Sequence, residues 1–129
     1  MSTSKCRILC IDDHHDSAEM LRLLLSEDET EVVIAASMTA ALELISREKF
    51  DLYVLDRRLP DGSGTELCTL LTSVTPGVPC IFYTGDAYEI HRKEALAAGA
   101  DEYICKPNVE KLIETVSKHL AEKECATSS

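Results

Sequence analysis

Residues 52–66 read LYVLDRRLPDGSGTE and contain the change of pattern on which the fold depends. The first four residues are continuously apolar, as in a parallel strand that is covered on both faces. The stretch from Ser63 to Glu66 is a capping box, in which the serine side chain and the glutamate carboxylate satisfy backbone donors at the start of a helix. These residues therefore predict a buried strand, an acid at its carboxyl end, a short turn and a helix.

The same change from strand to helix recurs along the whole chain. The five apolar runs are residues 8–11, 32–36, 52–55, 80–83 and 103–105. Helical periodicity follows each run, in residues 18–25, 41–45, 67–74, 88–98 and 109–120. Asn108 is placed to cap the last helix, and Gly99 stands where a helix end needs a positive φ. Strict alternation predicts the α/β class, with a single doubly wound, five-stranded parallel sheet.

The predicted helices differ in how much apolar surface they offer. The leucine-rich first helix, residues 18–25, is expected to be well buried. In the third helix, Leu67, Leu70, Leu71 and Val74 follow the spacing of an apolar face. The fourth helix has the weakest apolar pattern, so we expect it to be the most loosely held.

Length and composition fit one acidic domain. The chain has 129 residues and a mass of 14.2 kDa, so we expect a single domain over residues 1–129, with a core of about residues 5–121 and a polar tail at 122–129. With 13 Lys+Arg against 23 Asp+Glu, the net charge of −10 repels phosphate backbones, and we expect no direct nucleic-acid binding. No apolar run approaches the roughly 20 residues that span a bilayer, and the N-terminus lacks a signal-peptide pattern. We therefore expect a cytoplasmic protein without membrane contact.

The six cysteines do not form a recognisable disulfide or zinc pattern. Cys10, Cys80 and Cys105 lie in or beside apolar runs, where a reduced thiol behaves as a small hydrophobic group. There is no C-x-x-C motif. We expect free thiols, with Cys125 in the polar tail the most exposed.

Charged and hydroxyl residues gather at the carboxyl ends of the predicted strands, which is where open parallel sheets bind ligands. Asp12 and Asp13 follow the first run, Asp56 the third, Thr84 the fourth and Lys106 the fifth. Two carboxylates about 4 Å apart repel each other by roughly 4 kcal/mol at an effective dielectric constant of about 20, so three of them require a cation. Oxygen ligands beside open solvent suit Mg²⁺ or Mn²⁺.

With these residues in this order, the chain resembles the receiver domain of two-component response regulators, the family that includes the chemotaxis regulators. The resemblance covers roughly residues 7–120. Its segments are ILCIDD (8–13), Asp56 with LPDGSG (59–64), YTG (83–85), AAGAD (97–101) and YICKP (103–107). It implies a flavodoxin-like (βα)5 receiver fold.

The resemblance assigns the chemistry of the cluster. It implies that Asp56 is the phosphoacceptor, which takes a phosphoryl group from a histidine kinase or a histidine phosphotransfer protein. Asp13 and Asp56 would be direct Mg²⁺ ligands and Asp12 a ligand acting through water. The backbone carbonyl of Arg58 would complete the protein's share of the coordination.

The resemblance also implies a switch. Lys106 would pair with a phosphoryl oxygen, and Pro107 would follow a cis peptide bond that directs the ammonium inward. The hydroxyl of Thr84 would donate to the phosphoryl group, and Tyr103 would turn inward as Thr84 moves. The responding surface would be the fourth helix, the fifth strand and the fifth helix, which would contact a downstream protein or an effector domain of the same protein.

Several residues beside the predicted site depart from the usual pattern. Arg57 and Arg58 follow the acceptor, where their guanidinium groups should attract phosphate. We expect a salt bridge between Arg58 and Asp86 across the mouth of the site, which would restrict water and lengthen the phosphorylated state. The alternative is that both side chains point separately into solvent.

Two histidines, His14 and His15, follow the acidic pair, where an acid or amide is commoner. They either simply start the first helix or take part in the kinase contact or in pH sensitivity.

The leading hypothesis is a signalling module rather than an enzyme, with self-catalysed phosphoryl transfer and autodephosphorylation only. One rival is a Mg²⁺-dependent aspartyl-phosphate phosphohydrolase with Asp56 as nucleophile. Such enzymes usually carry a second aspartate two residues later as general acid, and this chain has Arg58 there. A second rival is a receiver-like scaffold that no longer takes phosphate.

Overall fold

A central parallel sheet organises the computed structural model, which describes residues 6–26 and 29–122. The strand order is β2-β1-β3-β6-β7. The strands are β1 (Cys6–Ile11), β2 (Thr30–Ala35), β3 (Leu52–Leu55), β6 (Cys80–Thr84) and β7 (Glu102–Cys105). All four pairings are parallel, which confirms the predicted five-stranded, doubly wound sheet.

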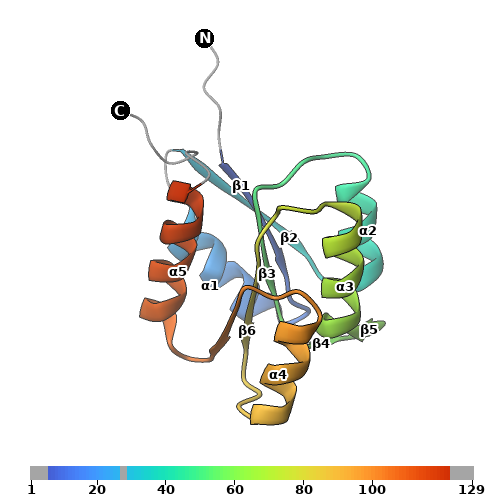
Figure 1. Ribbon diagram of the computed structural model, residues 1–129. Coiled ribbons are helices and arrows are strands. Elements are labelled where there is room, and N and C mark those ends of the chain that lie inside the picture. Colours follow the sequence, from blue (N-terminus) through green and yellow to red (C-terminus); the bar gives the residue numbers. More distant parts are fainter. Residues whose placement is uncertain (1–5, 27–28, 123–129) are drawn as a thin grey trace.

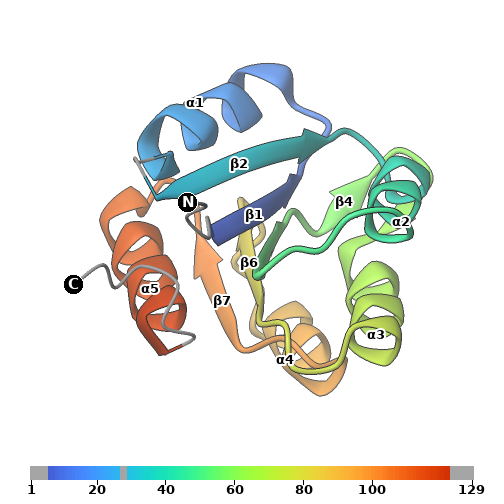
Figure 2. The same cartoon turned by 90° about the horizontal axis from the view of Figure 1, so that it is seen from above.

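Helices cover both faces of this sheet (Figures 1 and 2). Their bounds are α1 (His15–Leu25), α2 (Met38–Ile45), α3 (Gly64–Val74), α4 (Glu89–Ala97) and α5 (Val109–Glu122). Helices α1 and α5 pack on one face and α2, α3 and α4 on the other, so the strands contribute to two buried clusters. Within the described residues, none of the helices is long and apolar enough to cross a membrane.

The local signals at helix ends are confirmed. The Ser63 side chain accepts a hydrogen bond from the Glu66 N–H at 3.0 Å, and the Glu66 carboxylate accepts one from the Ser63 N–H at 3.2 Å. Asn108 Oδ1 accepts from the Lys111 N–H at 3.2 Å. Gly99 has φ +117°, a left-handed conformation that side-chain-bearing residues rarely adopt.

A short hairpin was not predicted. Strands β4 (Arg58–Leu59) and β5 (Gly62–Ser63) pair antiparallel, with Arg58 opposite Ser63. Each strand has only two residues, too few for a period-2 pattern to be visible in the sequence. The hairpin gives the segment between β3 and α3 a fixed backbone beside the sheet edge.

Two of the expected apolar faces are narrower than predicted. In α1, Leu21 and Leu25 are buried, whereas Leu23 is 79% exposed. In α3, Leu70 and Val74 are 42% and 61% exposed. Each helix lies on one sheet face only, so a leucine outside the contacting stripe remains in water.

The weak pattern of the fourth helix is confirmed. Ala95 is the one buried residue of α4, and Ile90 is exposed. Tyr88, which precedes the helix, is also exposed. Helix α4 is therefore held by little apolar contact, and polar contacts at its start carry more weight.

The described cysteines are free thiols, as expected. Cys6, Cys10, Cys68 and Cys80 are buried and Cys105 is half-buried. Burial raises the pKa of Cys10 to about 12, so this thiol stays protonated near neutral pH. Cys125 and the polar tail, apart from Glu122, lie outside the described residues.

Candidate functional site

The carboxyl ends of β1, β3, β6 and β7 meet at one edge of the sheet, beside α4 and the β4–β5 hairpin (Figure 1). An open pocket of about 600 Å³ lies there. Its lining residues are His14, Asp16, Ser17, Asp56, Arg58, Thr84, Gly85, Asp86, Tyr88 and Lys106. Of the predicted site residues, Asp56, Arg58, Thr84, Asp86 and Lys106 line this pocket.

Asp56 is held at the end of β3 by backbone contacts on both sides. Its N–H donates to the Ile11 carbonyl at 3.0 Å, and the residue is 7% exposed. The start of α3 packs so closely that a Cβ at Gly64 would collide with the Asp56 carbonyl oxygen. Glycine at position 64 therefore allows the helix to approach without displacing the carboxylate.

Lys106, the residue directly after β7, reaches the acids. Its Nζ lies 3.2 Å from Asp12 Oδ2, 3.3 Å from Asp56 Oδ2 and 3.3 Å from Ser17 Oγ. Burial by itself lowers the pKa of Lys106, but the charges of Asp56 and Asp12 outweigh that effect and raise it above its usual range. The ammonium therefore stays charged and neutralises part of the buried negative charge. The Lys106–Pro107 bond is cis, as the resemblance implied.

A compact group of potential ligands adjoins this ammonium. Asp12, His14 and Asp56 each offer a ligand atom, and these atoms lie within 4.8 Å of one another. Asp12 is buried, at 4% exposed, whereas the Asp13 side chain is 38% exposed and lies outside this group. Three carboxylates beside one lysine leave net negative charge, so the donor set fits a divalent cation.

His14 was not expected among these ligands. It is the N-cap of α1, with an extended backbone and no side-chain capping bond. Its Nδ1 instead lies 3.1 Å from Asp12 Oδ1 and 3.3 Å from Asp13 Oδ1. The interpretation that His14 only starts the helix is therefore incomplete. The available signal was its position directly after two acids at a strand end.

The predicted salt bridge between Arg58 and Asp86 is wrong. Arg57, one residue earlier, places Nη1 3.4 Å from Asp86 Oδ2. Arg58 belongs to β4, where it pairs with Ser63. Arg57 lies in the bend between β3 and β4, whereas Arg58 begins β4, and no pattern in the sequence marks where this short hairpin starts.

Asp86 links the site to α4 through its carboxylate. Oδ1 accepts from the Tyr88 N–H at 3.0 Å, and Oδ2 lies 2.6 Å from His91 Nδ1. Burial alone raises the pKa of Asp86, but the Tyr88 N–H, His91 and Arg57 together hold the pKa below its usual range. The carboxylate is therefore ionised near neutral pH and anchors the first turn of α4.

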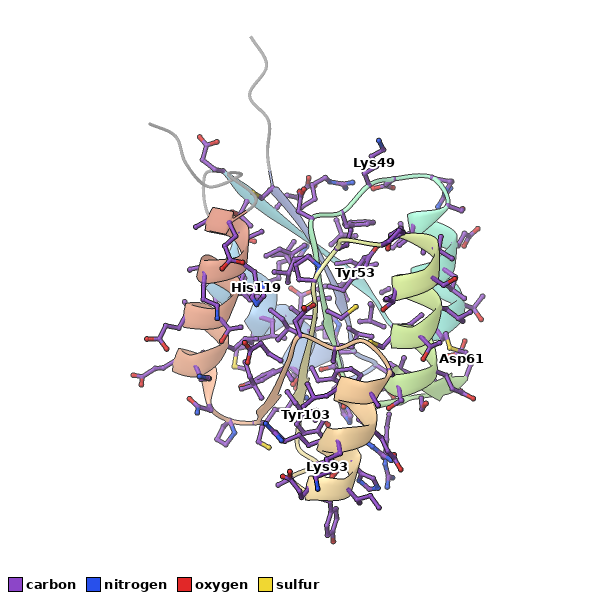
Figure 3. All side chains as sticks on the ribbon, viewed as in Figure 1. Lys49, Tyr53, Asp61, Lys93, Tyr103 and His119 are labelled. Carbon is purple, nitrogen blue, oxygen red and sulfur yellow. The ribbon has the colours of Figure 1, made fainter. Side chains whose placement is uncertain are left out.

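The two predicted switch residues both contact Asp86. Thr84 is 3% exposed, and its Oγ1 accepts a long hydrogen bond, 3.4 Å, from the Asp86 N–H. Tyr103 donates its hydroxyl to the Asp86 carbonyl at 2.7 Å and stacks on Phe82 with a centroid distance of 5.7 Å. Burial, followed by the Asp86 charge, raises the pKa of Tyr103 to about 12. Figure 3 shows Tyr103 beside α4.

Comparison with known proteins agrees with this geometry. Residues 8–117 match the family described as the response regulator receiver domain. The chain belongs to this family. The receiver-domain fold and the membership in response regulators that the sequence predicted are therefore confirmed.

Individual relatives support the assignment. The response regulator protein PilR of Pseudomonas aeruginosa is 35% identical over 104 residues, which are 81% of this chain and 23% of PilR. The DNA-binding response regulator MtrA of Mycobacterium tuberculosis is 34% identical over 107 residues, 83% of this chain and 46% of MtrA. The chain thus spans less than half the length of these two relatives.

A solved structure gives the same result for the fold. A CheY-like response regulator receiver domain protein from Methanospirillum hungatei is 38% identical, with a TM-score of 0.87. The match covers 94% of this receiver domain and 98% of the solved chain. The match therefore extends over nearly the whole chain.

Proposed function

We propose that this receiver domain accepts a phosphoryl group on Asp56 from a histidine kinase or a histidine phosphotransfer protein. The observation that carries the proposal is the placement of Asp56, a nearly buried carboxylate on the wall of an open pocket, 3.3 Å from Lys106 Nζ and in one compact ligand group with Asp12. A structural aspartate has no need of a pocket large enough for a phosphohistidine side chain. The chemistry is that of the receiver family, to which the chain belongs.

In the proposed step, a carboxylate oxygen of Asp56 attacks the phosphorus of the donor phosphohistidine. A new O–P bond forms, the N–P bond breaks, and the histidine nitrogen keeps the electron pair. Lys106 then pairs with a phosphoryl oxygen as a fixed positive charge. Because its ammonium already lies beside Asp56, little reorganisation is needed.

We propose that Asp12, Asp13 and Asp56, with the backbone carbonyl of Arg58, hold Mg²⁺ or Mn²⁺ at this site. When bound, such an ion neutralises the carboxylates and the phosphoryl oxygens. Asp12 and Asp56 lie in one compact ligand group, and Asp13 borders it. Until a cation compensates their charge, these carboxylates repel the negatively charged phosphoryl group of the donor.

Asp86 connects the pocket to the surface that we expect to respond to phosphorylation. Movement of the Thr84 hydroxyl toward a phosphoryl oxygen would disturb its contact with the Asp86 N–H, and with it the Tyr103 bond and the start of α4. We propose that the α4-β7-α5 surface responds and binds a downstream protein or an effector domain of the same protein. The weakly packed α4 suits such a response.

We propose a switch, not an enzyme with turnover on a separate substrate. Arg58 occupies the position where an aspartyl phosphohydrolase would carry its general acid.

MtrA is named as DNA-binding, but the matched region is 46% of that protein. The net charge of −10 supports the proposal that this chain makes no direct nucleic-acid contact. We place the exchange in the cytoplasm, in keeping with the kinase partner.

The test is phosphorylation by acetyl phosphate, followed by intact mass. The wild-type chain should gain one phosphoryl group with Mg²⁺ present and none with a chelator. Asp56→Asn should gain none, whereas Asp16→Asn, which alters an exposed acid on the same pocket, should behave as wild type. Phosphorylation of Asp56→Asn at the wild-type rate would refute the proposed acceptor.

A further inference from the structure

The imidazole of His14 lies where three carboxylates converge. Its Nδ1 is 3.1 Å from Asp12 Oδ1, 3.3 Å from Asp13 Oδ1 and 3.9 Å from Asp56 Oδ2. These acids come from the ends of two neighbouring strands, β1 and β3. The ring is 69% exposed and makes no capping hydrogen bond to α1, and the His14 N–H also donates to Asp12 Oδ1 at 2.9 Å.

Two of the three distances from Nδ1 are close to the edge length of a metal coordination polyhedron. With metal–ligand bonds of about 2.1 Å, adjacent ligands of an octahedron lie about 3.0 Å apart and opposite ligands about 4.2 Å apart. In a tetrahedron with the same bonds, the ligands lie about 3.4 Å apart. The distances of 3.1 and 3.3 Å from Nδ1 to Asp12 and Asp13 lie near these adjacent-ligand spacings, whereas the 3.9 Å to Asp56 is longer than either of them. A neutral His14 can therefore occupy one vertex while carboxylate oxygens occupy others.

We infer that His14 is a nitrogen ligand of the divalent ion, and that it shifts the preference of the site toward ions that favour imidazole, such as Ni²⁺, Co²⁺ and Zn²⁺. Mg²⁺ prefers oxygen donors and gains little from an imidazole. A site made only of the oxygen ligands of Asp12, Asp13 and Asp56 would favour Ni²⁺, Co²⁺ and Zn²⁺ over Mg²⁺ less strongly. With His14 in place, the site selects the ion as well as the phosphoryl group.

The same contacts allow one competing interpretation, in which a protonated His14 is itself the counter-cation of the acids. In that case the ring occupies the position of the ion and weakens the binding of every divalent cation to the same extent. Removal of the ring would then strengthen the binding of Mg²⁺ and Ni²⁺ alike. The two interpretations therefore predict opposite changes on substitution.

The inference deepens the proposed function and rests on its divalent-ion site. Its test is calorimetric titration of the unphosphorylated chain with Mg²⁺ and, separately, with Ni²⁺, at one fixed pH. The variants are His14→Ala and the control His15→Ala, which removes the exposed neighbouring imidazole at the first residue of α1. The control cancels any Ni²⁺ bound by surface histidines or thiols elsewhere. A long-range ¹H–¹⁵N spectrum with Zn²⁺ adds a direct reading of the His14 ring nitrogen.

His14→Ala should weaken Ni²⁺ binding at least about tenfold and Mg²⁺ binding by less than about threefold, given that even outer-shell changes cost metal sites about 10–100-fold. His15→Ala should change neither. In the spectrum, the Nδ1 resonance of His14 should move on addition of Zn²⁺.

An unchanged ratio of Ni²⁺ to Mg²⁺ affinity in His14→Ala would overturn the inference, as would tighter binding of both ions. If Mg²⁺ binds the wild-type chain while the ratio is unchanged, the proposed function survives without this role for His14. If neither ion binds the wild-type chain, both the inference and the proposed metal site are refuted.

Discussion

The hydroxyl of Tyr103 donates a 2.7 Å hydrogen bond to the backbone carbonyl of Asp86, two residues after Thr84. This bond joins β7 to the loop that leads into α4. The carboxylate of the same Asp86 pairs with Arg57, which directly follows Asp56. One residue thus connects the predicted acceptor, the predicted switch and the predicted output surface.

Tyr103→Phe should loosen this connection without disturbing the core. The ring still stacks on Phe82, and only the hydroxyl is lost. We expect a loss of stability of about 0.5–1.5 kcal/mol and faster amide exchange in α4. Urea denaturation and hydrogen exchange measure the two effects. Tyr88→Phe, at an exposed residue, should change neither, and equal effects in both variants would contradict the importance of the Asp86 bond.

A double-mutant cycle can separate Arg57 from Arg58. Arg57→Ala and Asp86→Ala should show a coupling energy of about 0.2–1 kcal/mol, as partly exposed ion pairs do. Arg58→Ala and Asp86→Ala should be additive, because it is Arg57 whose guanidinium lies 3.4 Å from the Asp86 carboxylate. A coupling found with Arg58 and not with Arg57 would show that the ion pair forms differently in solution.

Lys106 should contribute most to stability when no metal is bound. Lys106→Met leaves the Asp12 and Asp56 carboxylates without their ammonium, at a cost of about 1–3 kcal/mol. Saturating Mg²⁺ should recover part of this loss, since it neutralises the same acids. Thermal unfolding with and without Mg²⁺ measures both. Lys118→Met, which breaks an exposed 3.7 Å pair with Glu102, is the control and should have little effect in either condition.

Asp61 should make the fold sensitive to acid. Its carboxylate accepts hydrogen bonds from the Thr39 hydroxyl and from the N–H groups of Thr39 and Met38 at the start of α2. The Thr39 hydroxyl, followed by these N–H groups, lowers the pKa of Asp61 from 3.8 to about 2. Figure 3 shows this residue on the outer side of the molecule, beside the hairpin and the helices.

Because the folded pKa is the lower one, the stabilisation is present above about pH 4 and is lost as the pH falls toward about 2. Asp61→Ala should therefore lower the Tm at neutral pH, and its difference from wild type should shrink steadily on acidification. Asp16→Ala serves as the control for an exposed acid. A difference that is independent of pH would rule out the Asp61 carboxylate as its source.

The sequence predicted the site where geometry left no choice. The carboxyl ends of parallel strands lie along one edge of the sheet. Once the strands were recognised, the sequence therefore predicted that Asp12, Asp56 and Lys106 lie close together. The partner of Asp86 was missed for a local reason. The start of a hairpin with two-residue strands decides whether Arg57 or Arg58 reaches the Asp86 carboxylate, and no periodicity marks this hairpin in the sequence.

Side-chain direction accounts for the other errors. The position of His14 directly after two acids places it near them, but does not show that its ring turns back toward the acids instead of facing solvent. Likewise, the leucines of α1 show that the helix has an apolar face but not how wide that face is, and Leu23 proves to be exposed. Both features depend on how side chains pack against distant parts of the chain, and the residues next to them in sequence do not show this.

The identity of the acceptor is the central claim, and chemical mapping tests it most directly. After treatment with acetyl phosphate and Mg²⁺, borohydride reduces an acyl phosphate to an alcohol, so a phosphorylated aspartate becomes homoserine. Peptide mass spectrometry should find homoserine at position 56 and unmodified aspartate at Asp12 and Asp13. Homoserine at either of those residues, or phosphate that survives borohydride on a hydroxyl such as Thr84, would contradict the account.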